Sequence, residues 1–170
     1  MKIQRCCAIW GSAFLLSLIL LAGTAAQAQG KTGKYACAEP NPASLCNAGN
    51  TCGSASTPCT VDVKKAAGNG ASATPSIAGA KGNAFFCVTT STTVTWQSSS
   101  KNTGFVIDFG PASPFDAPDA IIGGAKKPVS VVAQKEGCFK YSVGACVSGA
   151  IYGMCGSGQA EAVVIGGGAK

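Results

Sequence analysis

Two neighbouring stretches decide the fold: Thr92-Thr93-Val94-Thr95-Trp96 and Gly104-Phe105-Val106-Ile107-Asp108-Phe109. In both, apolar residues alternate with polar ones, or β-branched and aromatic residues dominate, which is typical of a strand with one buried face. Residues 129–132, 139–143 and 162–165 repeat this signal further along the chain. Short strands at this spacing predict an all-β fold, specifically a small antiparallel Greek-key β-sandwich.

The connections between these segments agree with that fold. Residues 98–104 are polar and end in a glycine, which is typical of a turn between neighbouring antiparallel strands. Residues 110–119 are rich in proline, and proline lacks the N–H that a central strand needs for its ladder. We therefore expect a crossing loop there, with Phe115 tucked beneath it.

The beginning of the chain predicts export. Two basic residues precede an apolar run from Ala8 to Ala22, and Ala26-Gln27-Ala28 then provides the small-x-small pattern that signal peptidase accepts. Residues 1–28 are therefore expected to be a signal peptide, and Gln29 the mature N-terminus. The apolar run is shorter than the roughly 20 residues that a membrane-spanning helix needs. We expect a secreted or periplasmic protein with no membrane anchor once the signal is removed.

Cysteine usage indicates a disulfide framework. Of the 10 cysteines, Cys6 and Cys7 fall in the predicted signal, and an even number remains for an oxidising compartment. A zinc site is disfavoured because the spacings are wide and the chain has no histidine. Sequence distance suggests two sets, an N-terminal one and a sandwich one. They are Cys37, Cys46, Cys52 and Cys59, and Cys87, Cys138, Cys146 and Cys155, with Cys146 expected to pair with Cys155 and Cys87 with Cys138.

The composition of the chain changes near its middle. Residues 29–83 are rich in glycine, alanine and serine, so this segment cannot bury much apolar surface and is expected to be a loop-rich extension stapled by disulfides. Residues 65–81 have almost no large side chain, which predicts a linker. Residues 84–170 are then expected to contain the sandwich.

Charge and composition exclude several classes of function. The formal net charge of +6 falls to about +4 if Lys2 and Arg5 leave with the signal. No arginine follows Arg5 and the lysines are scattered, so nucleic-acid binding is not expected. Without histidine there is no Ser-His or Cys-His pair, and no catalytic residue is predicted. We do not expect an enzyme.

The order of the strand segments carries a family resemblance. Val94-Thr95-Trp96, the segment 105–110, the segment 137–143 and the closing 162–165 together resemble the small cupredoxin-like β-sandwich domains of bacterial secreted proteins. The likeness covers residues 84–166. In copper-binding members, two histidines, a cysteine and usually a methionine hold the metal. Because this chain has no histidine, the resemblance implies the fold without its electron-transfer function, and we expect no metal and no cofactor.

Three residue groups have alternative interpretations. Met154 and Cys155 could bind Cu(I) through sulfur, although a disulfide is the commoner role for such a cysteine. The loop aspartates could coordinate calcium, or could cap turns through their side chains; they are Asp108, Asp116 and Asp119. Trp96 could be an exposed stacking platform, but its alternation with Val94 favours a place in the core.

These observations predict a non-catalytic, secreted or periplasmic β-sandwich module for binding or structural interaction, whose partner is an unknown protein or surface. The alternative is a copper-handling or redox periplasmic protein that uses Met154 and a free cysteine. A count of free thiols separates the two functions, because the first predicts none and the second requires at least one.

Overall fold

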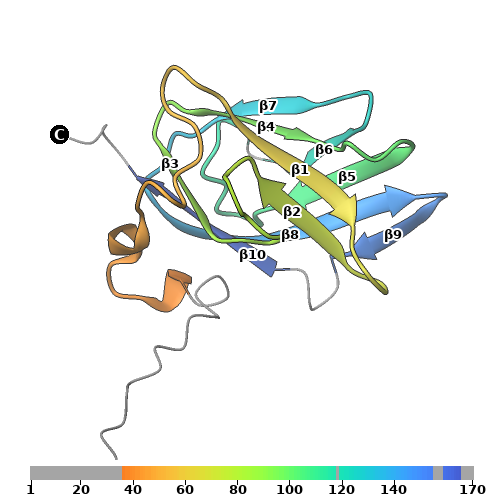
Figure 1. The fold of residues 1–170 in the computed structure, drawn as a ribbon, viewed down its shortest axis with the longest axis horizontal. Coiled ribbons are helices and arrows are strands. Elements are labelled where there is room, and N and C mark those ends of the chain that lie inside the picture. The colour runs from red at the N-terminus through yellow and green to blue at the C-terminus, as the bar shows by residue number, and fades with distance from the viewer. Residues whose placement is uncertain (1–35, 118, 155–158, 166–170) are drawn as a thin grey trace, which may run out of the picture.

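The protein is an all-β sandwich. The computed structural model describes residues 36–117, 119–154 and 159–165, and two sheets pack face to face in it (Figure 1). The strands are β1 (Cys59–Lys65), β2 (Ala71–Pro75), β3 (Phe86–Thr89), β4 (Thr93–Gln97), β5 (Thr103–Asp108), β6 (Ile121–Gly124), β7 (Val129–Val132), β8 (Gly137–Val147), β9 (Ala150–Gly153) and β10 (Gln159–Ile165). The predicted fold class is confirmed.

The two sheets are mixed. The first has the order β2-β1-β4-β7, and the second has the order β3-β10-β8-β5-β6, with β9 beside β8. Most pairs are antiparallel, as predicted, but β1 runs parallel to β4 and β3 runs parallel to β10. The first parallel pair arises because the chain crosses to the second sheet at β3 before it returns as β4; parallel neighbours need such a crossover.

Alternation along the strands builds the core. In β4, Val94 and Trp96 are fully buried while their neighbours are partly exposed, so the predicted core role of Trp96 is confirmed. Trp96 meets Tyr141 of β8 edge-on, with ring centroids 5.5 Å apart, and Phe115 in the same manner at 6.4 Å. Phe115 is buried beneath the crossing loop, as expected. Each such aromatic contact adds about 0.5–1.5 kcal/mol beyond the burial of area.

The predicted linker over residues 65–81 is wrong, because β1 and β2 form half of the first sheet. Val61 pairs with Pro75, and the register continues to Lys65 opposite Ala71. Small residues are needed here: a Cβ on Gly153 of β9 would lie only 2.7 Å from the Ala71 side chain. The composition that suggested a linker is therefore the composition that lets the two sheets approach each other closely at this edge.

The segment before β1 lies against the second sheet and is cross-linked to it. It contains two short 3-10 helices, η2 (Ala36–Ala38) and η3 (Pro42–Leu45). After them the backbone joins the edge of β3, where the Cys52 N–H donates to the Cys87 carbonyl at 2.8 Å and the Cys87 N–H donates to the Asn50 carbonyl at 2.9 Å. The part of residues 29–83 that the structure describes therefore extends the sandwich through backbone pairing.

The disulfides do not follow the two predicted sets. Cys37 is bonded to Cys138 and Cys46 to Cys87, so two bonds join the N-terminal segment to the sandwich. The third, between Cys52 and Cys59, closes a short loop before β1. The prediction failed because it paired cysteines by distance along the chain, whereas backbone pairing with β3 brings distant cysteines together. Cys146 is a free thiol, and its predicted partner Cys155 lies outside the described residues.

The predicted signal peptide, residues 1–28, and the expected mature N-terminus Gln29 also lie outside the described residues. Within the described part of the chain, no helix has the length and apolar character required to cross a bilayer.

Candidate functional site

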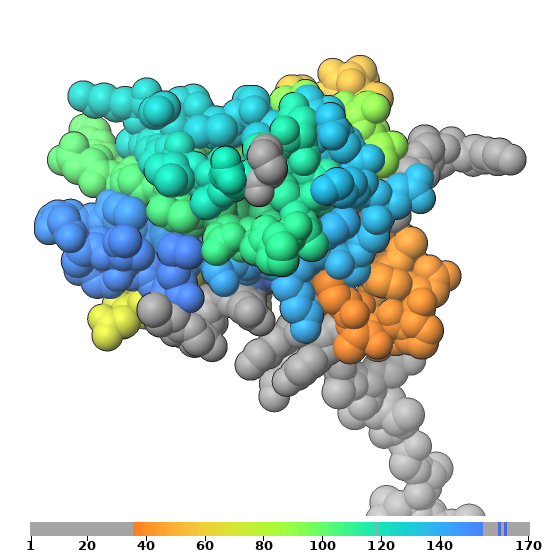
Figure 2. All heavy atoms as spheres, turned by 180° about the vertical axis from the view of Figure 1, so that it is seen from behind, coloured from red at the N-terminus to blue at the C-terminus, as the bar shows by residue number. Residues whose placement is uncertain are grey.

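Four short connections meet at one end of the sandwich, which we call the short-loop end. They join β1 to β2, β4 to β5, β6 to β7 and β8 to β9. Their residues are 66–70, 98–102, 125–128 and 148–149. Figure 1 shows the four turns on the same side of the two sheets, and Figure 2 shows their yellow, green, teal and blue tips together at one edge of the molecular surface. Topology thus gathers segments that are far apart in sequence.

The short-loop end carries a group of exposed lysines. Lys64 and Lys65 end β1, and Lys101 lies in the connection to β5. Lys126 and Lys127 occupy the connection between β6 and β7. Lysines that appear scattered in sequence therefore share one surface, and only the strand order could have revealed it.

The acidic residues of the loops lie at the opposite end, which we call the disulfide end. Asp108 ends β5, and Asp116 and Asp119 lie in the crossing loop that follows. Glu136 immediately precedes β8. Lys135 lies beside Glu136 at this end, so acidic residues outnumber lysines in these loops, whereas lysines predominate at the short-loop end.

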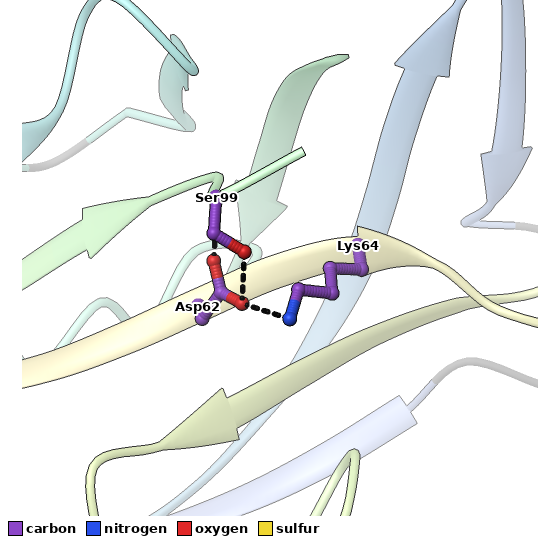
Figure 3. A network of polar contacts seen from close by, with 3 residues as sticks. All are labelled: Asp62, Lys64 and Ser99. Carbon is purple, nitrogen blue, oxygen red and sulfur yellow. Dashed lines mark hydrogen bonds and ion pairs between the residues drawn. The ribbon is translucent and has the colours of Figure 1, made fainter. Parts of the chain in front are cut away.

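Asp62 is the acidic residue nearest to the lysine group, and its charge is already paired (Figure 3). The Lys64 ammonium lies 2.7 Å from Asp62 Oδ2, the Ser99 N–H donates to Oδ1 at 2.7 Å, and the Ser99 hydroxyl donates to Oδ2 at 2.9 Å. Partial burial by itself would raise the pKa of Asp62, but Lys64 and the two Ser99 donors together hold it below its ordinary value. The network ties β1 to the connection between β4 and β5.

Two isoleucines near this end are exposed. Ile122 in β6 is 62% exposed and Ile151 in β9 is 63% exposed. They are the large hydrophobic side chains of the described residues that remain open to solvent. Each lies within two residues of a strand end that leads into a short connection. Apolar side chains therefore accompany the lysines.

Two open grooves run beside these isoleucines. One, of about 370 Å³, is lined by Ile122, Gly104, Asn102 and the two lysines 126 and 127. The other, of about 690 Å³, lies between the β1–β2 turn and β9. Its walls are fixed by Lys65, whose ammonium lies 4.0 Å from the centre of the Tyr152 ring, and by the Gly153 N–H, which donates to the Asn69 carbonyl at 2.8 Å. Neither groove collects a set of groups suited to bond-making chemistry.

The three aspartates proposed as calcium ligands do not converge. Asp108 Oδ1 accepts from the Gly110 N–H at 2.7 Å, and Asp116 Oδ1 accepts from the Val132 N–H at 2.8 Å. The first is a turn-capping bond, which was the alternative interpretation, whereas the second ties the crossing loop to β7. Among the described residues, no three histidine, cysteine, aspartate or glutamate side chains are placed to hold one metal ion.

Met154 lies on the outer face of the second sheet. A Cβ on Gly144 would be 2.9 Å from Met154 Sδ, so the thioether covers this glycine of β8. Cys146 is two residues further along β8 and therefore shares that face. The sequence singled out Met154 together with Cys155, whereas the free thiol that the structure describes beside it is Cys146.

The core contains three buried polar atoms with no hydrogen-bond partner among the described residues: Trp96 Nε1, Ser98 Oγ and Tyr141 Oη. Trp96 and Ser98 point to the same side of their strand segment, and Tyr141 packs against Trp96. Burial raises the pKa of the Tyr141 phenol far above its ordinary value. Sequence patterning predicted the aromatic core but gave no sign of these unpaired groups.

A comparison with models of protein families finds no family that matches this chain, and no curated protein is significantly similar to it.

Proposed function

We propose that this protein is a non-catalytic β-sandwich module that binds a partner through its short-loop end. The observation that carries the proposal is that exposed lysines on β1 and on two of the connections lie at the same end as the exposed isoleucines of β6 and β9. Exposed lysines occur elsewhere on the surface as well, but the two large hydrophobic side chains that are exposed among the described residues both lie at this end, so basic and apolar groups occur together here. The partner is a protein or a surface, as the sequence suggested.

The three disulfides indicate an oxidising extracellular compartment. We further propose secretion or export to the periplasm through the signal at residues 1–28. Export of the full chain from a bacterial host, followed by intact-mass measurement, tests this part. We expect a mass that corresponds to a chain beginning at Gln29, and a mass increase on reduction that corresponds to the opening of three disulfides. A mass that retains residues before Gln29 would contradict the proposal.

We also propose that the sandwich is cupredoxin-like and lacks the copper ligands of that class. The two-layer arrangement of mixed sheets supports this, as does the position of Met154 in the connection that precedes the final strand. The absence of histidine from the chain removes the equatorial nitrogen ligands of a blue-copper site. A protein that remains colourless after addition of Cu(II) and dialysis is the expected result.

Binding is tested with fluorescently labelled mature protein and isolated cell envelopes. Saturable binding that unlabelled protein displaces is expected. The matched variants are Lys127→Glu at the short-loop end and Lys135→Glu at the disulfide end, since both residues are exposed loop lysines. Loss of binding only in the first supports the proposal; equal loss, or no saturable binding by the parent protein, contradicts it.

One observation favours the alternative of a copper-handling or redox protein. Cys146 is a free thiol and shares the outer face of β8 with the Met154 thioether, and both are soft ligands for Cu(I). Anaerobic titration with Cu(I) against a competing chelator tests it. Stoichiometric binding that disappears in Cys146→Ser and weakens in Met154→Leu would place this function ahead of the binding module.

A further inference from the structure

We infer that the short-loop end docks onto an anionic lipid bilayer. This inference rests on the proposed binding function and names the partner. The lysines would face the phosphates of lipid headgroups, and Ile122 and Ile151 would enter the boundary between headgroups and acyl chains. Electrostatic attraction combined with burial of apolar side chains is what holds peripheral proteins on charged membranes.

The charge at this end is unopposed. Lys64 is paired with Asp62, and Lys65 lies over the Tyr152 ring, but Lys101, Lys126 and Lys127 have no ion-pair partner among the side chains that the structure describes. All three are exposed on the connections that link β4 to β5 and β6 to β7. Lysines at such tips can reach an anionic surface without any change in the sandwich.

The apolar groups are placed to follow the lysines into the interface. Ile122 lines the same open groove as Lys126 and Lys127. Ile151 adjoins Tyr152, whose ring lies under the Lys65 ammonium. Ile122 and Ile151 lie within strands, set back from the lysines of the connections. The isoleucines therefore reach the boundary between headgroups and acyl chains when the long lysine side chains bend back toward the phosphates and leave their apolar stems below.

The distribution of acidic residues sets an orientation. Asp108, Asp116, Asp119 and Glu136 lie at the disulfide end, so an anionic surface attracts one end of the molecule and repels the other. The strands would then run roughly perpendicular to the bilayer surface, and the cross-linked N-terminal segment would face away from it.

A lipid surface fits the shape of this end better than an acidic protein does. Both grooves are open, and the exposed lysines and isoleucines are spread over the ends of β1, β6 and β9 and over two separate connections. Tight protein complexes bury a central cluster in a well-packed pocket. A fluid bilayer adapts to separate projecting contacts without a complementary pocket. The acidic end of a second copy is the competing partner of matching charge, and the experiment below includes it as an outcome.

The experiment uses the mature protein and sedimentation with two kinds of vesicle, one of phosphatidylcholine alone and one of phosphatidylcholine with an equal amount of phosphatidylglycerol. We expect binding to the anionic vesicles only, weakened as the salt concentration rises. The triple variant Lys101→Glu, Lys126→Glu, Lys127→Glu should lose roughly a hundredfold or more in affinity. Lys135→Glu is the matched control and should bind as the parent does, with circular dichroism showing that each variant is folded.

A second pair of variants tests the apolar part. Ile122→Ser with Ile151→Ser should lower affinity for the anionic vesicles about tenfold while leaving its salt dependence unchanged. Equal binding to neutral vesicles, or full binding by the triple lysine variant, would overturn the inference. If the protein self-associated in the absence of vesicles, and Lys127→Glu abolished this self-association, the partner would be a second copy of the chain and not a bilayer.

The same proteins distinguish failure of this inference from failure of the proposed function. Suppose that the protein binds native envelopes but not anionic vesicles, and that protease treatment of the envelopes destroys the binding. The proposed binding function would then stand, and the partner would be a protein. No binding to envelopes or to vesicles would refute both.

Discussion

The two ends of the sandwich are stabilised in different ways. At the disulfide end, Cys37–Cys138, Cys46–Cys87 and Cys52–Cys59 join the N-terminal segment to the strands, and a long crossing loop covers Phe115. At the short-loop end, close backbone approaches at glycines and a few polar contacts hold short turns in place. Covalent rigidity is therefore concentrated opposite the proposed contact surface, which leaves the lysine-bearing turns free of cross-links in the part of the chain that the structure describes.

The largest expected effect comes from the bond that spans the most chain. Replacing Cys37 and Cys138 with serine should destabilise the protein by about 4.7 kcal/mol on the chain-entropy estimate for a loop of roughly 100 residues; the sequence separation is 101. The same replacement of Cys52 and Cys59, which are separated by 7 residues, should cost about 2.5 kcal/mol. Urea unfolding of the two double variants measures the difference. Equal losses would mean that native-state contacts, rather than loop length, set the contribution of each bond.

At the short-loop end, the sharpest stability test is Gly153→Ala. Gly153 has φ +93°, and an added Cβ would collide with the Val143 carbonyl and lie 2.7 Å from the Ala71 side chain. We expect a loss of about 2–3 kcal/mol, because both the strained backbone and the contact between the two sheets are affected. Gly149→Ala is the control: its φ is +81°, but a Cβ there meets nothing within 4 Å, so only about 1 kcal/mol should be lost. Thermal unfolding measures the loss of stability in each variant. Equal losses would show that β9 and β2 are not closely packed at Gly153.

In the core, between the two ends, one substitution is expected to increase stability. Tyr141→Phe removes a hydroxyl that is buried without a partner among the described residues, and should therefore stabilise the protein by about 1 kcal/mol. The phenol should also resist ionisation: because its pKa is raised by burial, its ultraviolet ionisation signal should appear only when alkali unfolds the protein. A destabilised Tyr141→Phe variant would reveal that an internal water satisfies the hydroxyl.

The smallest expected effect concerns the Asp62 network. The pKa of Asp62 in the folded state lies below the ordinary 3.8. The contribution of its carboxylate to the free energy of unfolding is therefore fully present above about pH 4 and is lost as the pH falls through the folded-state pKa. Solvent screening limits this to a few tenths of a kcal/mol, up to about 1 kcal/mol. Asp62→Asn should therefore be slightly less stable than the parent at neutral pH and equal to it near pH 2. Ser99→Ala should show part of the same pH dependence of stability. If the stability difference between Asp62→Asn and the parent instead increased in acid, the Asp62 carboxylate would not stabilise the folded state.

Much of the fold was predictable from patterning, and the failures have identifiable causes. The alternation at 92–96 and 104–109 predicted β4 and β5 correctly because their inward residues are large. The strand at Ala71–Pro75 was missed because its inward residues are alanine and proline, which carry little periodic signal. Hydrophobic pattern identifies strands, but it does not show which strands are neighbours.

The disulfides and the short-loop end depend on that missing information. Cys37 reaches Cys138, and Cys46 reaches Cys87, because the segment before β1 pairs with the edge of β3, and no local signal encodes this pairing. In the same way, Lys64 and Lys127 share one surface only because β1 and β4 are parallel neighbours and β7 follows β4. Both are consequences of strand order.

The position of β10 determines when the protein can assemble during synthesis. This last strand lies inside the second sheet, between β3 and β8, and pairs with both. Until residues 159–165 have left the ribosome, β3 and β8 each present an open edge with unpaired backbone groups. The second sheet therefore closes only after β10 has emerged, and a nascent chain that lacks residues 159–165 leaves both of these edges open to pairing with other chains.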